Sequence, residues 1–159
     1  MKSIYLLLPL YLKTNHKTNI MNNRTFTMIK PEAVQAGVHA DILKMIVDNG
    51  FRIVALRMHH LSRNDAMRFY AVHKGKPFYE TLVEYMSSGP IIAAILEADN
   101  AVAAYRCLVG ATNPQEAAEG TIRAKFGTDK TANAVHASDS DENARIEWEQ
   151  HFCEGDIML

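Results

Sequence analysis

Ile91-Ile-Ala-Ala-Ile-Leu96 is the stretch of sequence that decides the fold. It follows the turn pair Gly89-Pro90 and is apolar at every position. A run this short and this evenly apolar does not suit an amphipathic helix, and it is typical of a strand buried on both faces. The sequence therefore predicts a sheet with residues 91–96 as a central strand.

Other segments are predicted to form strands beside it. Residues 24–30 are rich in β-forming residues and alternate in character, and Pro31 closes them. Residues 51–58 read as a second strand, and residues 134–137 are the candidate for the last one. These four segments together predict a small sheet.

Apolar residues at helical spacing separate the predicted strands. Helices are expected at residues 39–49, after Ser62, up to Met86, after Asp99 or Asn100, at 121–126 and after Ser140, where Ala144, Trp148 and Phe152 form a stripe. The order is β-α-β-α-β-α-β with extra helices. The expected fold class is α+β, a ferredoxin-like βαββαβ sandwich, whose four-stranded, mainly antiparallel sheet has the helices packed on one side.

Length and composition indicate one globular domain. The chain has 159 residues, of which 48% are hydrophobic and 22% charged, with a formal net charge of −1 and a pI of about 6.6. There is no global basic field of the kind that accompanies nucleic-acid binding, so an anionic ligand would need a local cluster of Lys and Arg. Cys107 and Cys153 lie far apart without metal-type spacing, which argues against a disulfide framework or a zinc site.

The domain is expected to occupy residues 24–159, with residues 1–23 as an N-terminal extension. The apolar run at residues 4–12 is too short to span a bilayer. We expect a disordered extension or a start codon placed too early, with an export signal or a weak membrane or partner contact as the alternatives. The expected location is therefore cytoplasmic, with no membrane association.

Asn133-Ala-Val-His136-Ala-Ser138-Asp139-Ser140 places a histidine where a short strand ends, just before a capped helix. Glu147 follows Ser140 by about two helical turns, so it is within reach of the strand that contains His136. A carboxylate bonded to one imidazole nitrogen would leave the other as a nucleophile. The alternative is that His136 is only a structural hydrogen bonder.

Three cations stand beside turn signals in different elements, namely Lys30, Arg106 and Arg123. Side chains in such positions can converge on one site and stabilise the charge of a transferring phosphoryl group. The Gly-rich phosphate loop with its Gly-Lys-Ser/Thr is absent, so any grip on phosphate must come from side chains. The alternative for each cation is a solvated surface charge.

Neutral groups could complete such a site. Thr112, Asn133 and Tyr70 are candidate hydrogen-bond donors, and Phe78 after Lys76-Pro77 is a candidate exposed ring for stacking on a base. The alternative for Phe78 is burial in the core.

These segments together resemble the nucleoside diphosphate kinase family. The matching pieces stand in order from Arg24 to Phe152: residues 27–34, Lys76-Pro-Phe78, Ser88-Gly-Pro90, Gly110-Ala-Thr-Asn-Pro114, Gly120-Thr-Ile-Arg123 and residues 133–140, with Glu147 downstream. The His-x-Ser-Asp-Ser segment with that glutamate is highly specific to the family.

The resemblance implies a ping-pong reaction, in which His136 takes the γ-phosphate of ATP or another nucleoside triphosphate and passes it to a nucleoside diphosphate. It implies that Glu147 orients His136, that Ser138 supports the pair, and that Lys30 is also catalytic. The implied nucleotide-binding residues are Lys30, Tyr70, Phe78, Leu82, Arg106, Thr112, Arg123 and Asn133. Broad base specificity is expected, because an aromatic side chain can stack on the flat face of any base.

The resemblance also implies Mg²⁺ that arrives on the nucleotide phosphates without protein ligands, and a homo-oligomer that is a tetramer or a hexamer. Lys130 stands near a position that is often apolar in the family, which leaves base packing on that side open. Two other functions stay open from the sequence. One is a non-catalytic nucleotide-binding protein on the same fold, and the other is a single-stranded nucleic-acid binder, which the pI disfavours; no sequence-specific nucleic acid is expected.

Overall fold

The structure is a computed structural model that describes residues 23–158. The expectation for residues 1–23 therefore falls, apart from Asn23, outside the described residues. The strands are β1 (Arg24–Ile29), β2 (Arg52–His60), β3 (Pro90–Glu97) and β4 (Val135–Ala137). The α-helices are α1 (Pro31–Gln35), α2 (His39–Asp48), α3 (Arg63–Phe69), α4 (Tyr79–Met86), α5 (Ala101–Val109), α6 (Ile122–Phe126) and α7 (Asp141–Trp148).

The strands form one sheet in the order β2-β3-β1-β4, and every neighbouring pair is antiparallel. Strand β3 lies inside the sheet, since its Ile95 is opposite Phe26 of β1 on one side and Ala55 of β2 on the other. The predicted central strand and the α+β, ferredoxin-like arrangement are confirmed.

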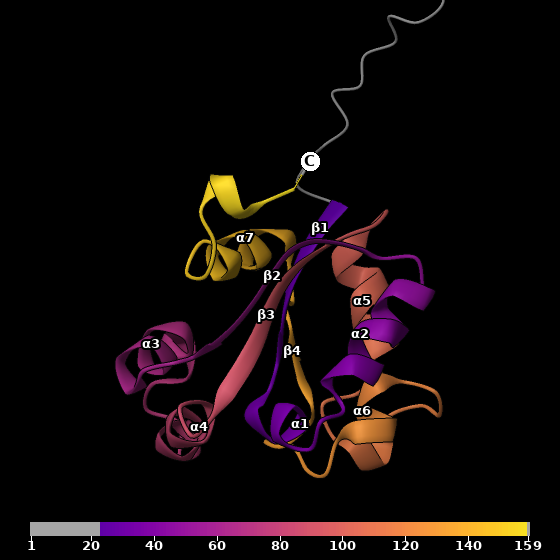
Figure 1. The fold of residues 1–159 in the computed structure, drawn as a ribbon. Helices are drawn as coiled ribbons and strands as arrows, with labels where there is room; N and C mark the ends of the chain where they lie inside the picture. The colour runs from indigo at the N-terminus through magenta and orange to yellow at the C-terminus, as the bar shows by residue number, and fades with distance from the viewer. Residues whose placement is uncertain (1–22, 159) are drawn as a thin grey trace, which may run out of the picture.

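Helices cover both faces of this sheet (Figure 1). Ile91, Ala93 and Ile95 pack with α3, α4 and Phe152, while Ile92, Ala94 and Leu96 pack with α1, α2, α5 and α6. The expectation that the helices lie on one side is therefore wrong. The physical reason is in β3 itself: successive side chains point to opposite faces, so a strand that is apolar at every position needs apolar cover on both.

Side-chain caps mark where α3, α6 and α7 begin, and the cap of α6 is Thr121. Ser62 Oγ accepts from the Asp65 amide at 3.1 Å, and Ser140 Oγ accepts from the Asn143 amide at 3.1 Å, as the sequence predicts. Asn100 stands at the expected cap of α5 but makes no side-chain cap bond, because its own backbone is left-handed with φ 50°. The cap of α7 matters most for the site described below, because the point where α7 begins determines which side of the helix Glu147 faces.

The last strand is shorter than expected. It begins at Val135 rather than at residue 134, because Ala134 has a left-handed backbone with φ 69° that cannot join a ladder. Lys30 likewise lies just past β1, at the start of α1. The end of β1 therefore lies beside the start of β4. Across this junction the amide of Lys30 donates to the carbonyl of Ala134 at 2.9 Å.

Two sequence features have simple outcomes. Cys107 and Cys153 are both free and exposed. Within residues 23–158, no helix combines the length and the apolar character that crossing a bilayer requires.

Candidate active site

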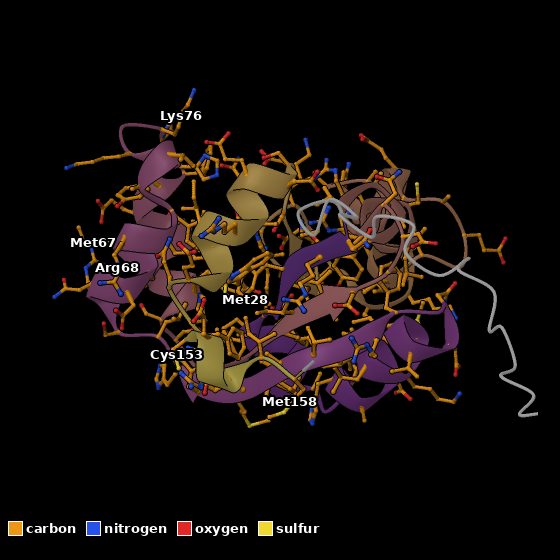
Figure 2. All side chains as sticks on the ribbon, turned by 90° about the horizontal axis from the view of Figure 1, so that it is seen from above. Met28, Met67, Arg68, Lys76, Cys153 and Met158 are labelled. Atoms are coloured by element: carbon orange, nitrogen blue, oxygen red, sulfur yellow. The ribbon has the colours of Figure 1, made fainter. Side chains whose placement is uncertain are left out.

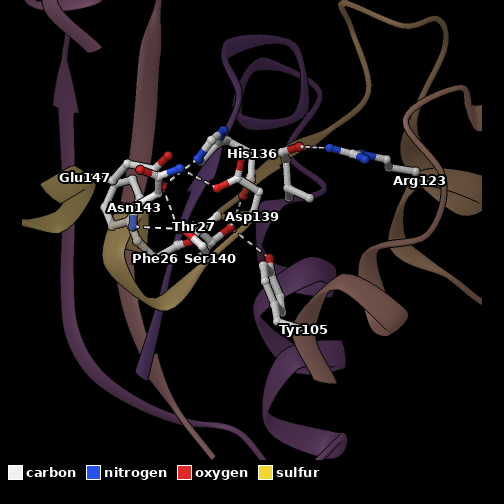
Figure 3. A network of polar contacts seen from close by, with 11 residues as sticks. Phe26, Thr27, Tyr105, Arg123, His136, Asp139, Ser140, Asn143 and Glu147 are labelled. Carbon is white, nitrogen blue, oxygen red and sulfur yellow. Dashed lines mark hydrogen bonds and ion pairs between the residues drawn. The ribbon is translucent and has the colours of Figure 1, made fainter. Parts of the chain in front are cut away.

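His136 lies in the middle of β4, opposite Met28 of β1. Its Nε2 is 2.8 Å from Oε2 of Glu147, which is in the last turn of α7 (Figure 3). Ser138 Oγ is 2.5 Å from the same carboxylate oxygen. The three residues that were predicted to act together are therefore in contact, and the imidazole edge that bears Nδ1 has no hydrogen bond to any residue that the structure describes.

Aromatic rings hold the imidazole from the other sides. Phe69 meets it edge to face with ring centroids 5.1 Å apart, and Phe26 is tilted against it at 6.2 Å. Such rings exclude water from the flanks of the imidazole without competing for its nitrogens. His136 and Glu147 are nevertheless partly accessible, with 19% and 17% of their side chains exposed, so a substrate can reach them.

Lys30 is buried, with 6% of the residue exposed, at the end of β1. Its Nζ donates to Oδ1 of Asn133 at 2.7 Å and to the carbonyl of Thr131 at 2.8 Å. The pKa of Lys30 is lowered to about 8, mainly by burial and also by the charge of Arg123, while the carboxylates of Glu32 and Asp129 oppose the shift. The ammonium group is thus fixed by two acceptors and is mainly charged at neutral pH.

Asn133 connects Lys30 to the loop after α5. Its Nδ2 donates to the carbonyl of Thr112 at 3.0 Å and to that of Lys130 at 3.1 Å. Thr112 itself is exposed, so its hydroxyl is open to a ligand. The exposed Lys130 contributes its backbone carbonyl to this arrangement.

Arg123, in α6, reaches the strand that contains the histidine. Its Nη2 donates to the carbonyl of Val135 at 3.0 Å and Nη1 donates to that of Gly110 at 3.2 Å, while the buried Nε has no partner among the described residues. Burial lowers the pKa of Arg123, and the charge of Arg106 lowers it further. Arg106 is exposed on α5 and lies close enough for its charge to act on Arg123.

A row of rings leads from the surface to the histidine. The ring centroid of Phe78 is 5.4 Å from that of His73, His73 is stacked 6.3 Å from Tyr70, and Tyr70 is 6.4 Å from His136. The Tyr70 hydroxyl is buried without a partner in the described part of the chain, and burial raises its pKa. An orphaned buried hydroxyl beside a nucleophile is a candidate donor to substrate.

Phe78 is 49% exposed, so the alternative that it fills the core is wrong. Its neighbour Lys76 extends from the surface of the molecule (Figure 2). Leu82, one helical turn further along α4, is half-buried and packs against the core that α3 and α4 cover. An exposed ring next to a half-buried leucine forms an apolar shelf at the outer end of the row of rings.

Sequence reasoning did not single out Glu32. Its Oε1 accepts from the amide of Ala134 at 2.8 Å, and its Oε2 accepts from the hydroxyl of Tyr85. Glu32 belongs to the motif at residues 27–34, but nothing in the sequence connects it to a residue 102 positions away. Only the antiparallel pairing of β1 with β4 brings them together.

Among residues 23–158, no three His, Cys, Asp or Glu side chains are grouped in a way that could hold a metal ion.

Comparisons with known proteins agree on one family. A sequence model described as nucleoside diphosphate kinase matches residues 23–157. The nucleoside diphosphate kinase of Flavobacterium psychrophilum is 58% identical over 130 residues, covering 82% of this chain and 94% of that protein, and that of Campylobacter lari is 52% identical over 135 residues, covering 85% and 98%.

Solved structures give the same result. The Aquifex aeolicus nucleoside diphosphate kinase superposes with a TM-score of 0.84 at 43% identity, covering 86% of this chain and 99% of that one. A halophilic nucleoside diphosphate kinase from Halobacterium salinarum, in complex with CDP, gives a TM-score of 0.83 at 34% identity, covering 87% and 92%. Family model, sequence identity and fold agree, and the chain belongs to the nucleoside diphosphate kinase family.

Proposed function

We propose that this phosphotransferase works in two half-reactions through a phosphohistidine on His136. The observation that supports this most is the bond between His136 Nε2 and Glu147, because it leaves Nδ1 as the nitrogen with a free lone pair. A hydrogen bond to a carboxylate fixes the proton on Nε2 and directs nucleophilic character to Nδ1.

In the first half-reaction, the Nδ1 lone pair attacks the γ-phosphorus of a nucleoside triphosphate. The bond between that phosphorus and the β,γ-bridging oxygen breaks, and the nucleoside diphosphate leaves with the electron pair. The ring gains positive charge, which Glu147 stabilises through the Nε2–H bond, while Ser138 holds the carboxylate oriented.

In the second half-reaction, a terminal phosphate oxygen of another nucleoside diphosphate attacks the same phosphorus. The N–P bond breaks, and its electron pair returns to Nδ1, so the enzyme is regenerated without a net gain or loss of protons on His136. One site serves both half-reactions, because donor and acceptor differ by a single phosphoryl group.

The cations and donors around His136 would hold the phosphates. Lys30 and Arg123 are fixed by backbone and amide partners, so they offer charge at little cost in side-chain entropy. Arg106 is exposed and would reach outward to the same phosphates, with Thr112 and Asn133 as neutral groups. Tyr70 would donate its unpartnered hydroxyl.

The base would lie on the shelf formed by Phe78 and Leu82. Stacking on an exposed ring does not depend on the hydrogen-bond pattern of the base, which supports broad base specificity. The CDP bound by the Halobacterium salinarum relative supports a nucleotide site on this fold.

Nucleoside diphosphate kinases use a divalent cation and bind nucleotides. We infer that the cation here is Mg²⁺ and that it arrives as the nucleotide complex, since phosphate oxygens and water are ligands that Mg²⁺ prefers. We also infer a cytoplasmic homo-oligomer, a tetramer or a hexamer, whose size light scattering would give.

Incubation with γ-³²P-ATP tests the phosphohistidine. The wild-type protein should acquire label that is stable in alkali and labile in acid, and addition of a nucleoside diphosphate should discharge it. His136→Ala should acquire none, whereas the control His60→Ala, at the exposed end of β2, should label normally. Wild-type protein that binds nucleotide but never acquires label would instead be a non-catalytic member of the family.

A further inference from the structure

Glu32 lies in the first turn of α1, with both carboxylate oxygens bonded to groups beside the proposed site. Oε1 accepts from the Ala134 amide at 2.8 Å, and Oε2 accepts from the Tyr85 hydroxyl. We propose that Glu32 is a positioning residue for phosphoryl transfer, whose carboxylate fixes the segment leading into His136 and supports the positive charge of Lys30. This assignment rests on the proposed function, because it gives Glu32 a role in that reaction.

Ala134 is the residue that Glu32 holds in place on the chain leading to His136. This residue is fully buried and has φ 69°, a left-handed conformation that is strained for a residue with a Cβ. Its backbone is held at both ends, since its amide donates to Glu32 and its carbonyl accepts from the Lys30 amide at 2.9 Å. Without the carboxylate, a buried amide loses its partner and the turn can relax.

That relaxation would reach the nucleophile directly. His136 is two residues after Ala134, and its bond to Glu147 depends on where β4 begins. Because β4 is only three residues long, it has few ladder bonds with which to resist a change in the turn before it. The hydrogen bond from the Ala134 amide to Glu32 therefore holds the backbone just before β4, where a longer strand would have ladder bonds.

Glu32 also contributes a negative charge close to Lys30. The Lys30 ammonium lies 6.0 Å from the centroid of the Tyr85 ring, and the Tyr85 hydroxyl is bonded to Glu32. The charged groups that face Lys30 are Glu32 and Asp129, which raise its pKa, and Arg123, which lowers it; Glu32 is the larger of the two raising contributions. Because the pKa of Lys30 is about 8 even with this carboxylate opposing the effect of burial, the negative charge of Glu32 helps to keep Lys30 charged near neutral pH.

Glu32→Gln separates charge from shape. The amide oxygen of glutamine can accept from the Ala134 amide, and its N–H can donate to the Tyr85 hydroxyl, so both contacts survive while the charge is lost. We expect Lys30 to titrate about one pH unit lower than in the wild type, the usual scale for an adjacent opposite charge. The readout is NMR titration of ¹³C-labelled lysine in the full chain, with Lys30→Arg to identify the resonance. A Lys30 titration that does not move would overturn the charge role.

Glu32→Ala tests the positioning role. At pH 6, where Lys30 is protonated in every variant, the rate of His136 phosphorylation should fall about tenfold or more in Glu32→Ala, the scale of one unsatisfied buried donor. In Glu32→Gln it should stay within about twofold of wild type. Equal rates for wild type and Glu32→Ala would overturn the positioning role, and so would a loss in Glu32→Gln as large as that in Glu32→Ala.

The matched controls are Glu84→Gln and Glu84→Ala, on the exposed face of α4. Both should leave the Lys30 titration and the phosphorylation rate unchanged. The NMR arm needs no catalysis, so failure of the proposed function, seen as wild-type protein that never labels on His136, is distinguishable from failure of the Glu32 assignment.

Discussion

Glu147 Oε2 lies 2.8 Å from His136 Nε2, although the two residues belong to different elements and are 11 positions apart. Between them the chain ends a strand, makes a turn that Ser138 and Ser140 organise, and runs through two turns of α7 (Figure 3). The carboxylate reaches the ring because the helix period returns it to the side that faces β4.

Glu147→Gln should lower turnover while leaving nucleotide affinity nearly intact. The introduced amide can still touch the imidazole but cannot stabilise its positive charge, so we expect a rate loss of about tenfold to a hundredfold, the scale of one charge-assisted hydrogen bond. Stopped-flow measurement of His136 phosphorylation and calorimetry of nucleotide binding check the two halves. An equal loss of affinity would assign Glu147 to binding. Glu149→Gln, in the exposed pair with Arg145, is the matched control and should behave as wild type.

Ser138→Ala should have a smaller effect of the same kind, about twofold to tenfold on the phosphorylation rate, because it removes a neutral donor to the Glu147 carboxylate. If Ser138 acts only through Glu147, then combining Ser138→Ala with Glu147→Gln should cost less than the sum of the two. Additive losses in the double-mutant cycle would show that Ser138 acts by another route.

The local part of this site is predictable from sequence and the long-range part is not. Helical spacing places Glu147 opposite His136, and the caps at Ser62 and Ser140 follow from residue type. The bond between Lys30 and Asn133 spans 103 positions, and that between Glu32 and Ala134 spans 102, so both depend on strand pairing that no local pattern specifies. The family motifs contain these residues, but a sequence motif does not show which of its residues are in contact in the fold.

The error about the helices has a different origin. Residues 91–96 predict a strand buried on both faces, and this requirement already implies helices on both sides of the sheet. A one-sided arrangement is typical of the minimal ferredoxin-like fold, where alternating strands need cover on one face only. In this chain α2 and α5, the helices that connect β1 to β2 and β3 to β4, cover one face, while α3, α4 and Phe152 supply the second layer.

Arg106→Ala and Arg123→Ala should each lower kcat/KM by a factor that corresponds to a few kcal/mol, the usual scale for one charged contact to a transition state. They should differ in stability. Arg123 donates to the carbonyls of Gly110 and Val135, so its loss should also lower Tm, whereas the exposed Arg106 should leave Tm unchanged. Calorimetry and steady-state kinetics on both variants test this, with Arg145→Ala as the surface control. Rates like those of the wild type in both variants would refute the shared phosphate site.

The buried His151 should make the stability of the fold depend on pH in the acid range. It is 6% exposed, stacks on Phe26 at 4.9 Å, and its Nδ1 lies 3.3 Å from Nε2 of His59. Burial lowers the pKa of His151 to about 4, as do the charges of His59, His136 and Arg57, while Asp65 opposes the shift. The folded state therefore holds this ring neutral at a pH where the unfolded chain, with an ordinary value near 6.5, binds a proton.

The sign of the effect follows from this difference. Between pH 6.5 and 4 the unfolded state binds more protons at this residue, so stability falls as the pH falls, by about 2 kcal/mol from pH 7 to 5 for this group alone. In His151→Phe, which keeps a ring against Phe26, the difference in unfolding free energy between pH 7 and pH 5 should shrink by about that amount. Urea titrations at the two pH values measure it, and any constant cost of the substitution cancels in the difference. His60→Phe, at the exposed end of β2, should retain the full difference, and an undiminished difference in His151→Phe would mean that His151 is not the group whose protonation opposes the fold.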